Sequence, residues 1–257
     1  MQDRFRKCWR IVTSLAAGLA LLLMVRCALA QGTGAQGQVE RLLKEADQAL
    51  AARRFDEARK AYHEAAGQVA SAYPAGSSDR VRVLNQAALG LRRLGELSAA
   101  EEFLSRAVEE MDGVRFPDPK QHERWLADLH NNLGLVLYQL GRSGSAEVYL
   151  KRALAARRAL LGNDSQKVGE TANNLGLALA SLGLYDAAAS QLEEARRIRS
   201  APGAEPGKLA ETLNNLALVR VNQRKTAGEI DSLLRQALEL YEKQNDRLAS
   251  AGVLDSL

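Results

Sequence analysis

The triplet Asn-Asn-Leu stands at positions 131–133, again at 173–175 and a third time at 214–216, so that it recurs at intervals of 42 and 41. A series of alanines runs in step with it, at spacings of 42, 46, 42 and 42: Ala65, Ala107, Ala153, Ala195 and Ala237. Two independent series with nearly the same period indicate an internal repeat, and a repeat of this length decides the architecture before any local motif does.

Each repeat has the pattern of two antiparallel helices. Small residues recur where the two helices must cross, at Ala46, Ala88, Gly134, Gly176 and Ala217 in the first helix and at Ala58, Ala100, Ala146 and Ala188 in the second. Small side chains let two backbones approach closely. Gly95, Gly141 and Gly183 stand where the first helix must end and the chain must turn. Because one helix pair cannot bury both of its faces, the pairs must stack into a solenoid with a continuous core.

These residues resemble the tetratricopeptide repeat, whose consensus has Leu and Gly or Ala in the first helix, and Ala, a large residue and Ala in the second. The match is clearest at Leu133, Gly134, Ala146, Leu150 and Ala153, and again at Leu175, Gly176, Ala188, Leu192 and Ala195. The 42-residue spacing exceeds the usual length of about 34. This spacing and the sequence of residues 209–217 (Leu-Ala-Glu-Thr-Leu-Asn-Asn-Leu-Ala) resemble the kinesin-light-chain type of repeat. The resemblance implies an all-α fold, a right-handed superhelical solenoid of about five helix-turn-helix repeats.

The resemblance covers residues 39–243 and divides the chain into segments. The five repeats are expected at about 39–72, 81–114, 127–160, 169–202 and 210–243. Residues 31–38 are rich in Gly and Gln and are expected to form a flexible leader. Residues 114–120 contain two prolines and are expected to form a loop. Residues 244–257 are expected to form a capping segment over the last repeat.

Residues 1–30 have the pattern of a secretory signal peptide. Four basic residues precede an uncharged run from Ile11 to Val25, and the segment closes on Ala28-Leu29-Ala30. The uncharged run is shorter than the roughly 20 residues of a membrane-spanning helix. We therefore expect a periplasmic or secreted protein, and an exported chain rich in Ala and Arg is typical of a bacterium. Two alternatives stay open, an uncleaved membrane anchor and a lipid-modified Cys27.

Removal of residues 1–30 changes the charge and the cysteine content of the chain. That segment holds both cysteines, five of the 35 basic residues and one of the 31 acidic residues, so the remainder has 30 of each charge and no cysteine. A neutral chain gives no electrostatic reason to bind nucleic acid. A chain without cysteine forms no disulfide.

The sequence shows no arrangement of residues that would carry catalysis. The three histidines are His63, in a second helix, His122, in the proline-bearing loop, and His130, at the start of a first helix. No two of them share a helix face at the spacing that metal ligands need, and no phosphate-binding loop follows a strand. We therefore expect no enzyme activity, no metal, no cofactor and no small-molecule substrate.

The resemblance also implies where a ligand would bind. In this family the first helices line the concave side, and the fifth, ninth, twelfth and thirteenth positions of each repeat face the groove. The predicted peptide-binding residues are Asn85, Asn131, Asn173, Asn214, Leu135, Tyr138, Leu177, Leu218 and Arg92. An asparagine offers both a donor and an acceptor to the backbone of an extended peptide. An alternative is that the asparagines support the fold, with Asn132, Asn174 and Asn215 bonded to the preceding connector.

The favoured function is that of an exported adaptor that binds an extended peptide or a partner helix in the concave groove. Its partners are expected to be proteins or peptides, with membrane contact only through an uncleaved N-terminal segment. The alternative is a structural subunit of a cell-envelope complex that uses self-association or the convex face. An adaptor should be monomeric alone, whereas an assembly subunit should be oligomeric.

Overall fold

The structure is a computed structural model that describes residues 34–244, 250 and 253. These residues form helices and short turns, and no strand occurs among them. The helices are residues 34–51, α2 (Phe55–Ala72), α3 (Ser78–Arg93), α4 (Leu97–Met111), α5 (Pro119–Gln139), α6 (Ser143–Leu161), α7 (Gln166–Ser181), α8 (Tyr185–Arg199), α9 (Pro206–Asn222) and α10 (Ala227–Lys243).

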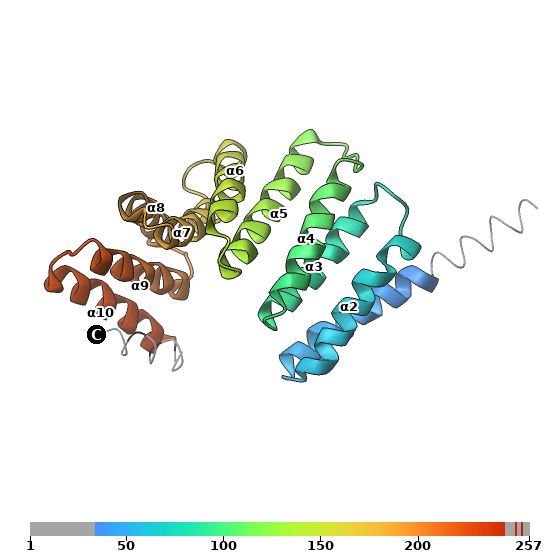
Figure 1. The fold of residues 1–257 in the computed structure, drawn as a ribbon, viewed down its shortest axis with the longest axis horizontal. Coiled ribbons are helices and arrows are strands. Elements are labelled where there is room, and N and C mark those ends of the chain that lie inside the picture. The colour runs from blue at the N-terminus through green and yellow to red at the C-terminus, as the bar shows by residue number, and fades with distance from the viewer. Residues whose placement is uncertain (1–33, 245–249, 251–252, 254–257) are drawn as a thin grey trace, which may run out of the picture.

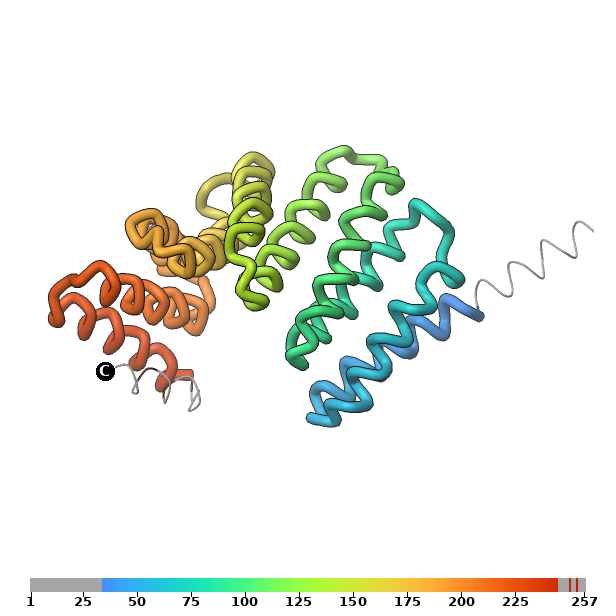
Figure 2. The backbone as a smooth tube through the Cα atoms, in the orientation of Figure 1, coloured from blue at the N-terminus to red at the C-terminus, as the bar shows by residue number. Residues whose placement is uncertain are grey.

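The helices form five consecutive antiparallel pairs, repeats 1 to 5, that stack side by side along an arch (Figures 1 and 2). Each labelled helix packs against the next one in the chain, both within a repeat and between repeats. The all-α solenoid predicted from the sequence is therefore confirmed. The predicted signal peptide, residues 1–30, lies outside the described residues.

The turn between the two helices of each repeat needs one residue with a positive φ angle. Gly95, Gly141 and Gly183 supply it in repeats 2 to 4, with φ angles of 81°, 78° and 75°. Glycine enters this left-handed region without steric cost. In repeats 1 and 5 the same place is held by Arg53 and Arg224, at 58° and 55°.

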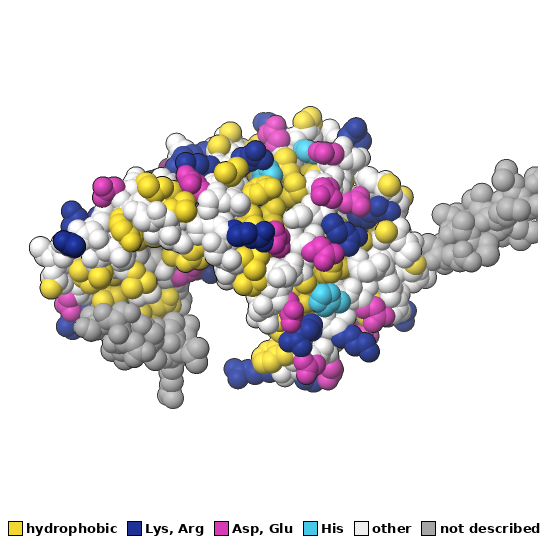
Figure 3. Space-filling view, in the orientation of Figure 1, with side chains coloured by type: hydrophobic (Ala, Val, Ile, Leu, Met, Phe, Trp, Pro, Cys, Tyr) yellow, Lys and Arg dark blue, Asp and Glu magenta, His cyan; other side chains and the backbone are white. Residues whose placement is uncertain are grey.

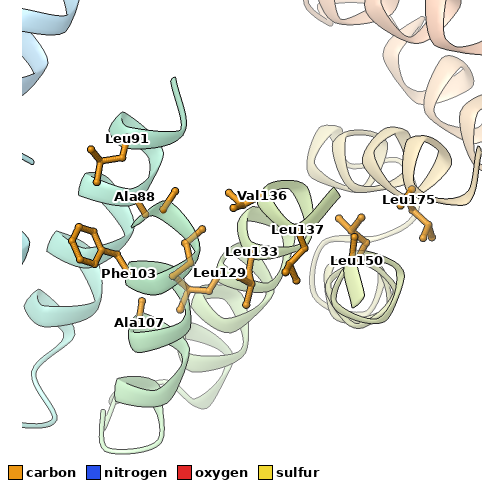
Figure 4. Packing of buried hydrophobic residues seen from close by; sticks show 14 of the residues in the cluster. Ala88, Leu91, Phe103, Ala107, Leu129, Leu133, Val136, Leu137, Leu150 and Leu175 are labelled. Carbon is orange, nitrogen blue, oxygen red and sulfur yellow. The ribbon is translucent and has the colours of Figure 1, made fainter. Parts of the chain in front are cut away.

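The small residues in the first helices allow close crossings within each repeat. A Cβ atom added to Gly134 would lie 2.6 Å from Cγ of Leu150, and one added to Gly176 would lie 2.6 Å from Cγ of Leu192. The leucines therefore occupy the space that a larger residue would need. Figure 4 shows the resulting core, a continuous row of buried side chains that crosses from one repeat to the next: Ala88, Leu91, Phe103, Ala107, Leu129, Leu133, Val136, Leu137, Leu150 and Leu175.

Two expected boundaries are wrong. Residues 34–38 of the expected flexible leader are helical, because Ala35 continues the buried face of the first helix and packs against the core. The expected loop at 114–120 ends earlier, since α5 begins at Pro119. Asp118 caps that helix by accepting a hydrogen bond from the backbone N–H of Lys120 (2.9 Å). Proline suits the first turn of a helix, where its missing N–H is not needed.

The two ends of the solenoid differ. The outer face of the first helix is polar, with Lys44, Glu45 and Gln48 exposed. A polar outer face is typical of a terminal repeat. Most of the expected capping segment, residues 244–257, lies outside the described residues, but Val253 is buried and belongs to the core cluster.

Candidate functional site

The first helices of repeats 2 to 5 (α3, α5, α7 and α9) line the inner side of the arch. Consecutive members of this set contact each other directly, which is expected for the side toward which a stack of helix pairs bends. Arg92 on α3 is also close enough to Glu170 on α7 and Glu211 on α9 for these carboxylates to affect its pKa. We call the surface formed by these four helices the inner face. Figure 3 shows the hollow that the arch leaves between its two ends.

The asparagines of the Asn-Asn pairs bond to one another from repeat to repeat. The second asparagine of each pair donates to the side-chain oxygen of the first asparagine (or the equivalent residue) in the preceding repeat. The Nδ2–Oδ1 distances are 2.9 Å from Asn132 to Asn85, 3.2 Å from Asn174 to Asn131 and 3.1 Å from Asn215 to Asn173. We call these residues the asparagine ladder.

The ladder corrects the prediction that Asn131 and Asn173 contact a peptide. Both residues are completely buried, with 0% of their surface exposed. Their Nδ2 groups donate to Glu170 (3.1 Å) and Glu211 (3.4 Å) of the following repeat. A buried amide whose donor and acceptor are both used is not available to a ligand. The alternative role in support of the fold is therefore the correct one for these two residues, although the partner of each second asparagine is the preceding asparagine and not a connector.

The ends of the ladder are less enclosed. Asn85 is partly exposed, and within the described residues its side chain accepts from Asn132 alone. Asn214 is also partly exposed as a residue, but its Oδ1 atom is buried and has no hydrogen-bond partner among the described residues. These two amides keep hydrogen-bonding capacity that the central ones have lost.

Four leucines, one from each first helix, form a partly exposed apolar strip along the inner face. Its members are Leu89, Leu135, Leu177 and Leu218, accompanied one turn later by Tyr138 and Val221. The strip is most open in repeat 5, where Leu218 is 47% and Val221 53% exposed. The structure therefore places the predicted residues Leu135, Leu177, Leu218 and Tyr138 on one accessible surface.

Arg92 lies on the same surface, in repeat 2, and carries a charge that is only partly compensated. No ion pair forms on its side chain within the part of the chain that the structure describes, and its buried Nε atom has no hydrogen-bond partner there. Burial and the neighbouring Arg93 lower the pKa of Arg92, while Glu170 and Glu211 act in the opposite sense. An arginine remains charged at neutral pH in spite of such a shift.

The sequence analysis missed two buried arginines at the junctions between repeats. Arg157 on α6 donates to the hydroxyl of Thr171 (2.6 Å) and to the carbonyl of Lys167 (2.8 Å) at the start of the next repeat. Arg199 on α8 makes the same contacts with Thr212 (2.6 Å) and Lys208 (3.0 Å). The available signal was an arginine that recurs with the period of the repeat, ahead of Glu-Thr at 170–171 and 211–212.

The histidines lie apart from one another, and each packs against a different neighbour. His63 is 5.7 Å from Phe103 and His130 is 5.4 Å from Tyr149, measured between ring centroids. His122 lies in α5 and not in a loop, and its Nε2 is 3.1 Å from the carbonyl of Met111. Among the described residues no group of three or more His, Cys, Asp or Glu could hold a metal ion. None of the helices described combines the length and hydropathy needed to cross a membrane.

Comparison with known proteins identifies the repeat. Residues 125–201 match the family model of the tetratricopeptide repeat. No curated protein matches the sequence. The crystal structure of BtubC (BKLC) from P. vanneervenii is similar over 86% of this chain and 86% of that one, with 25% identity and a TM-score of 0.67.

Two further solved structures share the fold. The nearly identical TPR-like repeats of a Podosopora anserina protein classed as a kinesin light chain align over 82% of this chain and 98% of that one (15% identity, TM-score 0.65). The Rap conjugation gene regulator of the plasmid pLS20, solved in complex with the Phr* peptide, aligns over 82% of this chain and 55% of that one (16% identity, TM-score 0.63). Residues 125–201 therefore carry tetratricopeptide repeats, and the described helices as a whole share the fold of solved structures that include kinesin-light-chain repeats.

Proposed function

We propose that this protein is an interaction scaffold that holds an extended peptide or a partner helix against the apolar strip of its inner face. The observation that carries the proposal is the strip itself. Four successive first helices present a leucine at the same position, and none of these four leucines is fully buried. An apolar surface that recurs in register along a solenoid offers a ligand one anchoring place per repeat.

The energy available to such a ligand is moderate. Covering Leu218, which is 47% exposed, contributes about 1 kcal/mol, and each of the three less exposed leucines contributes less. The strip would therefore give about 2 to 3 kcal/mol before the cost of ordering the peptide is subtracted. Asn85, a partly exposed amide at the end of the ladder, would add hydrogen bonds to the backbone of the ligand. Arg92 would favour an acidic residue at the end of the strip in repeat 2.

The comparisons support the class of partner and leave its identity open. The Rap regulator that shares this fold was solved with a peptide bound. A partner that is a protein or a peptide is therefore in keeping with the fold, and the scaffold proposal requires no catalytic group.

The test compares exposed apolar residues on two faces of the protein. Leu218→Lys and Val221→Lys together place charges on the strip, whereas Val148→Lys does the same on α6, a second helix, where Val148 is 49% exposed. We expect a partner captured from the native envelope fraction to be lost with the first variant and retained with the second. A photo-crosslinking residue at position 218 should also reach that partner, while one at position 148 should not.

Two other outcomes would replace the proposal. If both variants keep the same partner, the inner face is not the binding surface. If the wild type is oligomeric by light scattering and Val148→Lys makes it monomeric, the chain is an assembly subunit that uses its convex face, on the side of the second helices. Circular dichroism must first show that both variants fold like the wild type.

We also propose that the chain is exported to the periplasm or secreted, which rests on the pattern of residues 1–30. The test is mass spectrometry of the protein purified from an envelope fraction. A mature chain that begins at Gln31 would support cleavage of a signal peptide. A chain that keeps residues 1–30 and sediments with membranes would instead be anchored.

A further inference from the structure

Among the described residues, no carboxylate lies within hydrogen-bond distance of the buried arginine between repeats 4 and 5. Arg199 is only 4% exposed. Within the described residues both of its hydrogen bonds leave Nη1, toward the carbonyl of Lys208 and the hydroxyl of Thr212. The only carboxylate that forms an ion pair with it among those residues is that of Glu211, at 3.9 Å from Nη1. This distance is too long for a hydrogen bond. No hydrogen bond leaves Nη2 within that part of the chain.

The charge of the counterpart one repeat earlier is met by two carboxylates, although its buried Nε atom has no hydrogen-bond partner among the described residues. Arg157 makes the same two contacts from Nη1, and its Nη2 also donates to Oδ1 of Asp128 at 2.7 Å. A second carboxylate, that of Glu170, lies 3.2 Å from Nη1. Charge-assisted hydrogen bonds of this kind are about twice as strong as neutral ones. In repeat 3, Asp128 therefore binds the arginine of its own repeat, whereas Glu170, the equivalent residue of repeat 4, does not bind Arg199.

The reason lies in the direction of one side chain. Glu170 stands one repeat period after Asp128 and occupies the same place in its repeat. Its two oxygens accept from Arg157 and Asn131, which lie on the side of the preceding repeat. It therefore cannot at the same time lie against Arg199 as Asp128 lies against Arg157.

The corresponding space in front of Arg199 is a pocket. Its volume is about 290 Å³, and its lining includes Lys167, Glu170, Arg199, Ala204, Glu205 and Lys208. Lys167 is held by Asp128 at 2.6 Å, whereas Lys208 lies 3.5 Å from its partner Glu211 and can turn toward the pocket. Burial lowers the pKa of Arg199 even though Glu211, Glu170 and Glu205 act to raise it. Within the described residues, the charge of this arginine is thus incompletely compensated.

We propose that this pocket binds a carboxylate group of a peptide ligand, in the place before Arg199 that Asp128 takes before Arg157. A singly charged carboxylate suits the site better than a phosphate, because a doubly charged group would lie beside Glu170 and Glu205. Either an acidic side chain or the carboxylate at the end of a chain could supply the group. The inference does not rest on the apolar strip, since none of the residues that line the pocket belongs to it.

The test uses the full chain, labelled with ¹⁵N, and three small compounds as probes. N-acetylglutamic acid α-amide carries only a side-chain carboxylate, N-acetylglycine only a terminal one, and N-acetylglutamine amide neither. We expect saturable shifts of the Lys208 and Thr212 amide resonances with at least one carboxylate and none with the neutral amide. The compound that binds more tightly identifies the source of the carboxylate.

A matched pair of variants tests the position of the site. Ala204 lines the pocket, so Ala204→Glu should place a carboxylate of the protein itself before Arg199, whereas Ala204→Gln fills similar space without charge. We expect binding to be lost in Ala204→Glu and kept in Ala204→Gln. Removal of a negative charge in Glu205→Gln should tighten binding about two- to five-fold at low salt.

The proposal is overturned if no carboxylate gives a saturable shift, or if the neutral amide gives the same one. It is also overturned if Ala204→Glu, shown by circular dichroism to be folded, binds as tightly as Ala204→Gln. Because this experiment uses no protein partner and leaves Leu218 unchanged, its failure would not affect the proposal for the inner face, and the reverse also holds.

Discussion

At the scale of single residues, the central asparagines Asn131 and Asn173 were predicted to contact a ligand, but the structure shows that they join neighbouring repeats. An asparagine that recurs on the inner side of a repeat protein suggests a ligand contact, because its amide can bond to a peptide backbone. In the structure Asn131 and Asn173 are buried and bonded across the junction to the next repeat. Burial of this kind depends on how closely two repeats approach, and one repeat read by itself does not contain that information.

The ladder leads to a prediction about stability. Asn173→Leu removes the acceptor of Asn215 and Thr212, whose atoms lie 3.1 and 3.2 Å from its Oδ1. The Thr212 hydroxyl keeps the carbonyl of Lys208 as an acceptor (3.0 Å), but the partly buried amide of Asn215 loses its partner, which should lower the free energy of unfolding by about 1 to 3 kcal/mol. Asn85→Leu is the control, since Asn85 is partly exposed and has one partner. Urea unfolding followed by circular dichroism should show a clearly smaller loss for the control; equal losses would mean that burial does not matter here.

A second prediction concerns the two arginines with positive φ angles. Arg53 and Arg224 are exposed and hold the place that glycine holds in repeats 2 to 4. A residue other than glycine in this region costs roughly 1 to 2 kcal/mol of steric strain. Glycine removes that strain, but it also raises the conformational entropy of the unfolded chain, which offsets part of the gain. Arg224→Gly should therefore raise the free energy of unfolding by up to about 1 kcal/mol. The reverse change, Gly141→Arg, should lower it, and thermal unfolding of both variants would reveal opposite shifts.

At the scale of helices, the sequence predicts the pairs well and their starts poorly. The small residues and turn glycines belong to the packing of one repeat, so their period alone locates each helix pair. The starts depend on local capping: Pro119 and Lys120 were predicted to lie in a loop but begin α5, and the first helices of repeats 2, 4 and 5 begin at Ser78, Gln166 and Pro206, slightly before the predicted repeat boundaries. A cap such as Asp118 is recognisable only once the helix that begins after it is known.

The crossing of helices within a repeat gives the third prediction. Gly134→Ala brings a methyl group within 2.6 Å of Cγ of Leu150, so the α5–α6 pair must separate or Leu150 must leave its rotamer. We expect a loss of about 1 to 3 kcal/mol in the free energy of unfolding. Gly67→Ala in the interior of α2 is the matched control, because a Cβ there meets nothing within 4 Å. That change should stabilise the protein by about 0.5 to 1 kcal/mol, since alanine is the better helix former.

At the scale of the whole molecule, the junctions between repeats determine how far the chain behaves as one unit. In a solenoid each repeat contacts only its neighbours, so one weak junction can divide the unfolding of the chain into two steps. The junction between repeats 3 and 4 depends on Arg157, which joins α6 to the carboxylates of Asp128 and Glu170 and to the hydroxyl of Thr171. The sequence did not point to this residue, because its partners come from two different repeats.

The last prediction follows from that junction. Arg157→Ala leaves Glu170 without its cation, while Asp128 keeps Lys167 at 2.6 Å, and because both carboxylates are partly exposed to water we expect a loss of about 2 to 3 kcal/mol and not the full penalty of a buried pair. The two parts of the chain, repeats 1 to 3 and repeats 4 and 5, should then unfold separately in urea.

Two signals would detect this separation. Fluorescence of Trp125, in a Trp9→Phe background, follows repeat 3, while circular dichroism follows all the helices. The two signals should coincide in the wild type and in Arg158→Ala, which removes a neighbouring, partly exposed ion pair with Glu194 that has no buried arginine. They should separate in Arg157→Ala. Coincident curves for Arg157→Ala would show that apolar packing alone couples repeats 3 and 4.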